Sequence, residues 1–96
     1  MMHEAADSAL ASLRAELTEL ESEIVAIERR LSDVRAQQHT IEVRAIEAIY
    51  AGDDLAARSA LWDATPHAEA AASLEADLKV ARAMADACRW FLDSHR

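Results

Sequence analysis

Turn-forming residues are scarce in this sequence. Its 96 residues include one glycine, Gly52, and one proline, Pro66. Sheets and loop-rich folds need such residues at most of their turns, so both fold classes are excluded. A glycine-rich phosphate loop and the glycine-flanked nucleophile turn of hydrolases are excluded for the same reason. The composition predicts an all-α chain with few interruptions.

Groups that carry common protein chemistry are equally sparse. Cys88 is the single cysteine, so the chain forms no internal disulfide and has no cysteine pair for zinc. None of the four histidines has an acidic residue three positions before it, so the Glu-x-x-His element of di-iron bundles is missing. We therefore expect no enzymatic activity, no metal and no cofactor, and we interpret Cys88 as a buried structural residue.

Long apolar runs and excess positive charge are also lacking. No stretch approaches the 18 apolar residues of a membrane span, and the first residues do not have the pattern of a secretory signal. The net charge of −8 disfavours direct binding to nucleic acid or to an anionic membrane, but it permits binding to a basic protein surface. We expect a cytoplasmic protein with protein partners.

What the sequence does contain is a heptad seam. Apolar residues follow one another at alternating steps of three and four, with Gln38 as one polar member. The seam is Leu10, Leu13, Leu17, Leu20, Ile24, Ile27, Leu31, Val34, Gln38, Ile41 and Ala45. A stripe of two apolar residues in seven suits a partner helix. Gln38 either fixes the register of that pairing or is a tolerated polar residue near an exposed edge.

The spacing predicts three helices in a single domain, residues 1–96. The first covers about 4–51 and ends before Gly52, which suits the left-handed position past a helix end. A short helix at about 54–63 follows. Thr65-Pro66 then has the residues of a helix start and predicts a third helix at about 66–94, with its own small-residue seam. Short connections make neighbours antiparallel, so we expect a long helical hairpin, an antiparallel coiled coil with a short intervening helix.

The two ends of the first helix predict different environments. Residues 41–50 are apolar nearly all round, so we expect the second and third helices to enclose them, with Leu55, Leu61 and Trp62 as covers. The third helix is too short to reach the other end. This leaves four leucines for a second molecule: Leu10, Leu13, Leu17 and Leu20.

Flanking charges bear on how a second copy would pair along this seam. In a parallel, in-register dimer the flanking pairs would be Glu16–Glu21′, Glu23–Glu28′ and Arg30–Arg35′, all of like charge. An antiparallel pairing centred near residues 25–26 brings Glu23 near Arg30′, although Glu21 then lies near Glu28′. We expect an oligomer, and a homodimer of antiparallel rather than parallel helices.

Two further features are candidate contact sites. Trp90 falls outside the stripe of the third helix, so it is either a partner contact or a partly exposed side chain. Asp53 and Asp54 lie at the tip of the predicted hairpin. In layout this tip resembles that of the coiled-coil factors, of the Gre and DksA types, that enter the secondary channel of bacterial RNA polymerase and carry acidic residues there. Capping of the next helix by either aspartate is the alternative interpretation.

Three functions are compatible with these features. The first is a non-enzymatic coiled-coil interaction module that self-associates or docks on a partner protein. The second is a small acidic inhibitor, of phage type, that covers a basic nucleic-acid-binding surface of a larger enzyme. The third, which the resemblance implies, is a transcription regulator that acts through Asp53 and Asp54.

Overall fold

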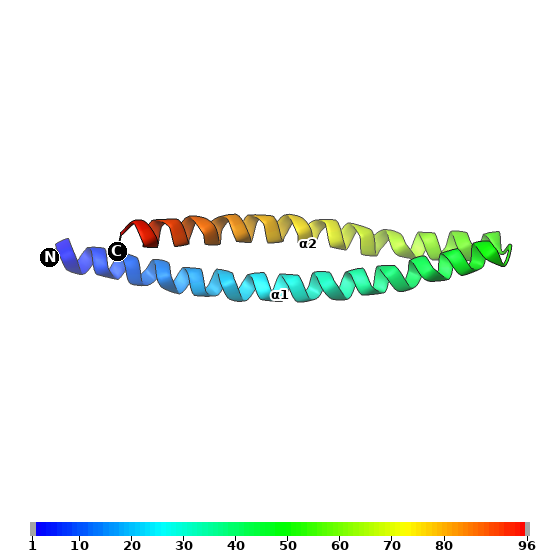
Figure 1. Cartoon of the computed structure of the whole chain (residues 1–96), viewed down its shortest axis with the longest axis horizontal. Coiled ribbons are helices and arrows are strands. Elements are labelled where there is room, and N and C mark those ends of the chain that lie inside the picture. Colours follow the sequence, from blue (N-terminus) through cyan, green and yellow to red (C-terminus); the bar gives the residue numbers. More distant parts are fainter. Residues whose placement is uncertain (1, 96) are drawn as a thin grey trace. The chain divides into compact units, whose positions relative to one another are not determined.

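The computed structural model describes residues 2–95 of the chain, and the side chains of residues 4–95. It contains two helices, α1 (Met2–Tyr50) and α2 (Asp54–Ser94), and no strand occurs in the described residues (Figure 1). The predicted all-α helical hairpin is therefore confirmed. Contacts between the helices group into two compact units, Met1–Ile27 with Asp77–Arg96 and Glu28–Ala76.

The turn between the helices is built by Gly52 and Asp53. Gly52 has a positive φ of 73°, the left-handed conformation that a side chain disfavours. The Asp53 N–H donates to the Ala48 carbonyl (2.9 Å) and the Gly52 N–H to the Ile49 carbonyl (3.1 Å), which together form a Schellman motif. Asp53 then caps α2, because its Oδ1 accepts a hydrogen bond from the Ala56 N–H at 3.0 Å.

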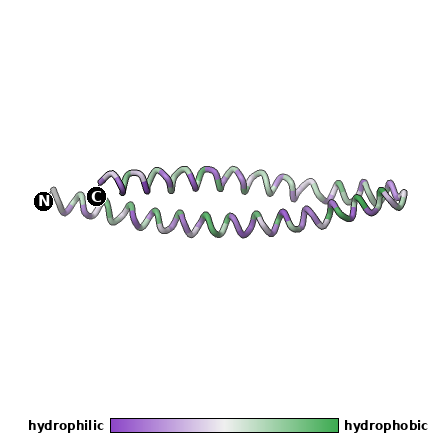
Figure 2. The backbone as a smooth tube through the Cα atoms, viewed as in Figure 1, coloured by the Kyte–Doolittle hydropathy of each residue, from purple (hydrophilic) through white to green (hydrophobic). Residues whose placement is uncertain are grey.

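The heptad seam accounts for the packing of both helices. Apolar residues recur at regular intervals along each helix, with polar residues between them (Figure 2). Within residues 4–95, the buried and half-buried side chains all lie at seam positions. On α1 these run from Leu10 to Ala48, and on α2 from Ala57 to Leu92, at alternating steps of three and four. The seam of α1 thus packs against α2 of the same chain.

In the unit Glu28–Ala76, one apolar cluster sets how the helices are aligned. Ile41 and Ala45 of α1 pack with Ala60 and Ala64 of α2. One step of three residues away from the turn leads from Ile41 to Gln38 and from Ala64 to His67, and both of these polar side chains are half-buried. We infer that Gln38 and His67 share one layer of the seam. A polar layer of this kind specifies register at some cost in stability.

Ion pairs flank the seam in both units. Arg35 pairs with Glu75, and Arg44 lies 3.7 Å from Asp63, in the unit Glu28–Ala76. In the other unit, Arg89 lies 3.7 Å from Glu21. These side chains are half-exposed, so each pair contributes only about 0.2–1 kcal/mol, but all three join α1 to α2 with opposite charges. The flanking charges therefore support the antiparallel pairing within the chain.

The predicted short helix at 54–63 and the break at Thr65-Pro66 are wrong. α2 is one helix of 41 residues with Pro66 inside it. Pro66 lacks an N–H for the Trp62 carbonyl, but it lies on the exposed face, and the seam keeps its spacing across it through Ala60, Ala64 and His67. The Thr65 hydroxyl and the His67 Nδ1–H donate to the Leu61 and Asp63 carbonyls in the same turn, at 3.4 and 3.1 Å. Packing along the seam therefore outweighs the local cost of the proline.

The long α2 also corrects two expectations about burial. Leu20 is 7% exposed, and Leu10, Leu13 and Leu17 are half-buried in the seam, so the first helix does not lack an intramolecular partner there. Residues 41–50 are not enclosed either, because no third helix exists in the described residues to cover them. Leu55, Leu61 and Trp62 are exposed rather than acting as covers.

Replacing the proline tests the continuity of α2. We expect Pro66→Ala to raise the free energy of unfolding by about 1–3 kcal/mol, because an interior proline costs about 3 kcal/mol in a helix and alanine restores the missing N–H. Urea denaturation followed by circular dichroism measures this change. Glu69→Ala, at an exposed position of the same helix, is the control and should change stability by less than about 0.5 kcal/mol. A loss of stability in Pro66→Ala would show that Pro66 starts a separate helix.

Candidate protein-interaction surface

The largest group of exposed apolar side chains surrounds the turn. We call it the tip surface, and it consists of Val43, Ile46, Ile49, Tyr50, Leu55, Leu61 and Trp62. Tyr50 is 88% exposed and Trp62 81%. Several large apolar side chains exposed at one end of a fold usually mark an interaction site. The tip surface is therefore the candidate functional site.

Alanines in the seam explain why these side chains are outside it. Near the turn the seam positions are Ala45 and Ala48 on α1 and Ala57 and Ala60 on α2. Three of these four alanines are buried, and Ala48 is half-buried. Small seam residues bring the two helix axes close together, so little room is left between them for larger side chains. The large apolar residues of this region occupy the outer faces of both helices instead.

Ile49 and Leu61 lie together on one flank of the hairpin. Ile49 is two heptads from Arg35 on α1, and Leu61 is two heptads from Glu75 on α2. A heptad repeat returns to the same side of a coiled coil, so Ile49 and Leu61 lie on the flank that carries the Arg35–Glu75 ion pair, at matching heights. We call this side the Arg35 flank. Ile46 is three residues from Ile49 and shares its face of α1.

The opposite flank of the tip is lined by small and polar residues rather than large apolar ones. It carries the ion pair of Arg44 and Asp63. A shallow groove there is lined mainly by small and polar residues: Arg44, Glu47, Ala48, Ala51, Asp53, Ala56, Ser59 and Ala60. Large apolar side chains are not among them. The two flanks of the tip are therefore distinct, and the Arg35 flank is the apolar one.

The two aspartates of the tip have structural positions. Asp53 is the N-cap of α2, and Asp54 lies in the first turn, where a carboxylate interacts favourably with the helix dipole. The capping interpretation of Asp53 is therefore confirmed. A role of either residue in a polymerase channel stays a prediction.

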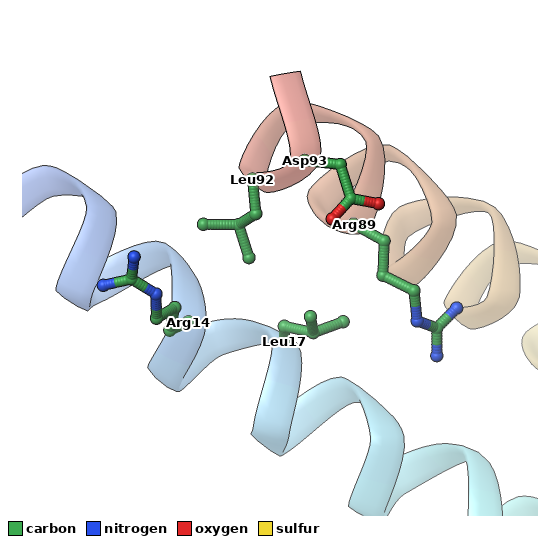
Figure 3. Close-up of a pocket in the computed structure, with 5 residues that line it drawn as sticks. All are labelled: Arg14, Leu17, Arg89, Leu92 and Asp93. Carbon is green, nitrogen blue, oxygen red and sulfur yellow. The ribbon is translucent and has the colours of Figure 1, made fainter. Parts of the chain in front are cut away.

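The four leucines assigned to a partner line the seam of the other unit. Figure 3 shows Leu17 of α1 and Leu92 of α2 in a shallow pocket, together with Arg14, Arg89 and Asp93. Arg89 donates to Asp86 Oδ1 at 2.9 Å and also lies near Glu21. Leu20 is buried, and Leu10, Leu13 and Leu17 are half-buried at seam positions, with Leu17 and Leu20 beside residues of α2. Their assignment to a second molecule stays a prediction.

The aromatic residues near the end of α2 lie outside the seam. Trp90 is 70% exposed, which agrees with its placement off the stripe and leaves it available to a partner. Phe91 stacks on His95, with 4.1 Å between the ring centroids and 21° between the ring planes. The unit Met1–Ile27 with Asp77–Arg96 therefore also has exposed aromatic side chains, as the tip does.

Chemistry-bearing side chains do not gather in the described part of the chain. Among those residues, no three His, Cys, Asp or Glu side chains are placed to hold a metal ion. Neither helix, over the residues described, has a segment both long and apolar enough to cross a bilayer. Cys88 is half-buried at its seam position, which fits the structural interpretation.

Comparison of the chain with protein-family models, curated proteins and solved structures found no match.

The sequence contained a signal for the tip surface, but we interpreted it as a sign that these residues are enclosed by other helices. Residues 41–50 are apolar beyond the seam, and so are Leu55, Leu61 and Trp62, while the nearby seam positions are alanines. A two-helix hairpin cannot cover more than one stripe of each helix. Apolar residues outside that stripe therefore mark an exposed surface, once the number of helices is known.

The exposure of the tip surface predicts how it responds to substitution. We expect Trp62→Ala to change the free energy of unfolding by less than about 0.5 kcal/mol, because the side chain has few contacts to lose. Leu31→Ala, at a buried seam position, should cost about 2–4 kcal/mol. Urea denaturation of both variants provides the comparison. Equal losses would mean that Trp62 is part of a packed core.

Proposed function

We propose that the chain is a non-enzymatic helical-hairpin module that binds protein through its tip surface. The exposed cluster of large apolar side chains around the turn carries this proposal. The seam holds the two helices together, so the outer faces near the turn are presented on a fixed scaffold. Tyr50 and Trp62 are so exposed that their side chains contribute little to the fold.

The amount of apolar surface suits a protein partner. Tyr50 and Trp62 together present on the order of 300 Å², since each aromatic side chain buries about 150–250 Å² when fully covered. Five aliphatic side chains add to this area. A specific protein interface buries about 800 Å² on each partner, so the tip surface supplies a large part of one. Tyr and Trp are also the residues that most often dominate the binding energy of interfaces.

The charge of the chain supports protein rather than nucleic acid as the partner. A net charge of −8 opposes approach to phosphate backbones and anionic lipid headgroups. The proposal places the module in the cytoplasm, where its single cysteine stays reduced.

Capture experiments test the tip surface directly. The wild-type chain and Ile49→Lys are immobilised, then exposed to cell extract and to a differently tagged copy of the chain. Val25→Lys is the matched control, because Val25 is also an exposed apolar residue of α1 but lies far from the turn in sequence. We expect at least one bound protein, or the tagged copy, to be lost from Ile49→Lys and retained by Val25→Lys. Identical binding by all three chains would refute the proposal.

An acidic inhibitor is the second candidate, and a groove in the first unit favours it. Leu20, Val80, Ala81 and Met84 line this groove with two acidic residues, Glu23 and Asp77. An apolar floor with carboxylates at its edge is complementary to a basic amphipathic helix. An inhibitor of this kind would cover such a segment on a nucleic-acid-binding enzyme.

Salt dependence separates this candidate from the first. Binding through the acidic groove should weaken as ionic strength rises, and Glu23→Lys with Asp77→Lys should abolish it, because charge attraction is screened by salt. A titration of the captured partner by isothermal calorimetry at two salt concentrations measures this. Binding that is indifferent to salt and to these substitutions would exclude the inhibitor.

A further inference from the structure

The apolar stripe changes width along the unit Glu28–Ala76. Farther from the turn, the flanking positions beside the seam are charged, as at Arg35 and Glu75. Two heptads closer to the turn the same positions are Ile49 and Leu61, 61% and 54% exposed. Two apolar positions in seven suit a two-helix seam, whereas three in seven suit a helix that faces the core of a larger bundle. The tip therefore has the pattern of a bundle with more helices than this chain supplies.

The positions of Ile49 and Leu61 make the Arg35 flank complementary to itself. They are on different helices, on one flank and at one height. If a second copy is related by a two-fold axis parallel to the helices, α1 of each chain lies beside α2 of the other. Ile49 then meets Leu61 of the other copy, and the contact occurs twice. Closed two-fold dimers with self-complementary surfaces are the commonest protein oligomers.

The charges on the flank fit the same arrangement. Arg35 and Glu75 also lie at one height on different helices, so each would face the opposite charge on the second copy. With the turns at opposite ends, Arg35 and Glu75 would extend beyond the turn of the second copy and meet no charge. Opposite charges across an interface fix its register and orientation.

We propose that Ile46, Ile49 and Leu61 of the tip surface are covered by a second copy of this chain, with Arg35 flank against Arg35 flank and both turns at the same end. The two hairpins form a four-helix bundle around Ile49, Leu61 and Ile46, with Tyr50 and Trp62 at its rim. The inference rests on the proposed function and names the partner of that same surface. This arrangement differs from the expected antiparallel pairing of two first helices along the seam, because α1 of each chain contacts α2 of the other and the two copies of α1 run parallel.

The mass in solution tests the dimer. Sedimentation equilibrium of the wild-type chain from micromolar to millimolar concentration should give twice the chain mass of 10.5 kDa. The double variant Ile49→Lys, Leu61→Lys should give the mass of one chain, with an unchanged helical circular dichroism spectrum, because both side chains are exposed in the hairpin. Val80→Lys should remain dimeric, because Val80 lies in the groove beside Glu23, which is three heptads from Arg44 and therefore on the opposite flank. A dimer that survives the double substitution would overturn the proposal.

Cross-linking tests the orientation. In a Cys88→Ser background, Ile49→Cys and Leu61→Cys chains are oxidised separately and as a mixture. The proposed arrangement places each introduced cysteine beside the other position of the second copy, so the mixture should form disulfide-linked dimers several-fold faster than either variant alone. Equal rates, or a faster reaction within one variant, would overturn the arrangement.

The two proposals fail in different ways. A wild-type chain that is monomeric throughout this range, yet loses a captured protein on Ile49→Lys, would overturn the second copy as partner and leave the tip surface as an interaction site. A monomer whose captured proteins are unaffected by Ile49→Lys would overturn both.

Discussion

Apolar contact along the seam between α1 and α2 is the interaction on which the rest of the structure depends. Neither helix has another packed neighbour in the described residues, and an isolated helix is only marginally stable in water. The ion pairs beside the seam, such as Arg44 with Asp63, are half-exposed and contribute little energy. These ion pairs instead favour one alignment of α1 against α2, because opposite charges meet only in that alignment. The polar layer that we infer from Gln38 and His67 restricts the alignment in the same way, since a shifted register would place these side chains against aliphatic neighbours.

The kind of residue in the seam determines what the outer faces can do. Where Leu31 and Leu74 are buried, the seam contains the large side chains, and the flanks beside it are polar. Near the turn, Ala45 and Ala60 are buried, and the large apolar side chains are displaced to the outside. One hairpin thus combines a part whose large apolar side chains are buried in the seam with a part whose large apolar side chains are exposed. This division links the packing of the helices to the proposed role of the tip.

Much of the fold could be predicted from the sequence, because its signals were local and repeated. The seam, the end of α1 before Gly52, the cap at Asp53 and the antiparallel return all follow from spacing and turn chemistry. Pro66 misled the prediction because its local preference for a helix start is outweighed by packing on both sides of it, which no short window reveals. The candidate site was missed for a related reason. Whether Ile49 and Trp62 are enclosed depends on how many helices surround them, and the supposed third helix supplied a cover that does not exist.

The turn at Gly52 also bears on how the chain reaches this fold. Closing the loop between Ala48 and Ala57 costs little entropy, but an alanine layer returns little apolar burial. Closing the longer loop between Leu31 and Leu74 costs only about 1.4 kcal/mol more, because loop entropy grows with the logarithm of length. Two leucines that become buried there return about 1.5–3 kcal/mol each. The leucine layers therefore contribute more of the free energy that holds the hairpin closed than the alanine layers beside the turn. Separating an alanine layer beside the turn exposes less apolar surface than separating a leucine layer, so it costs less free energy.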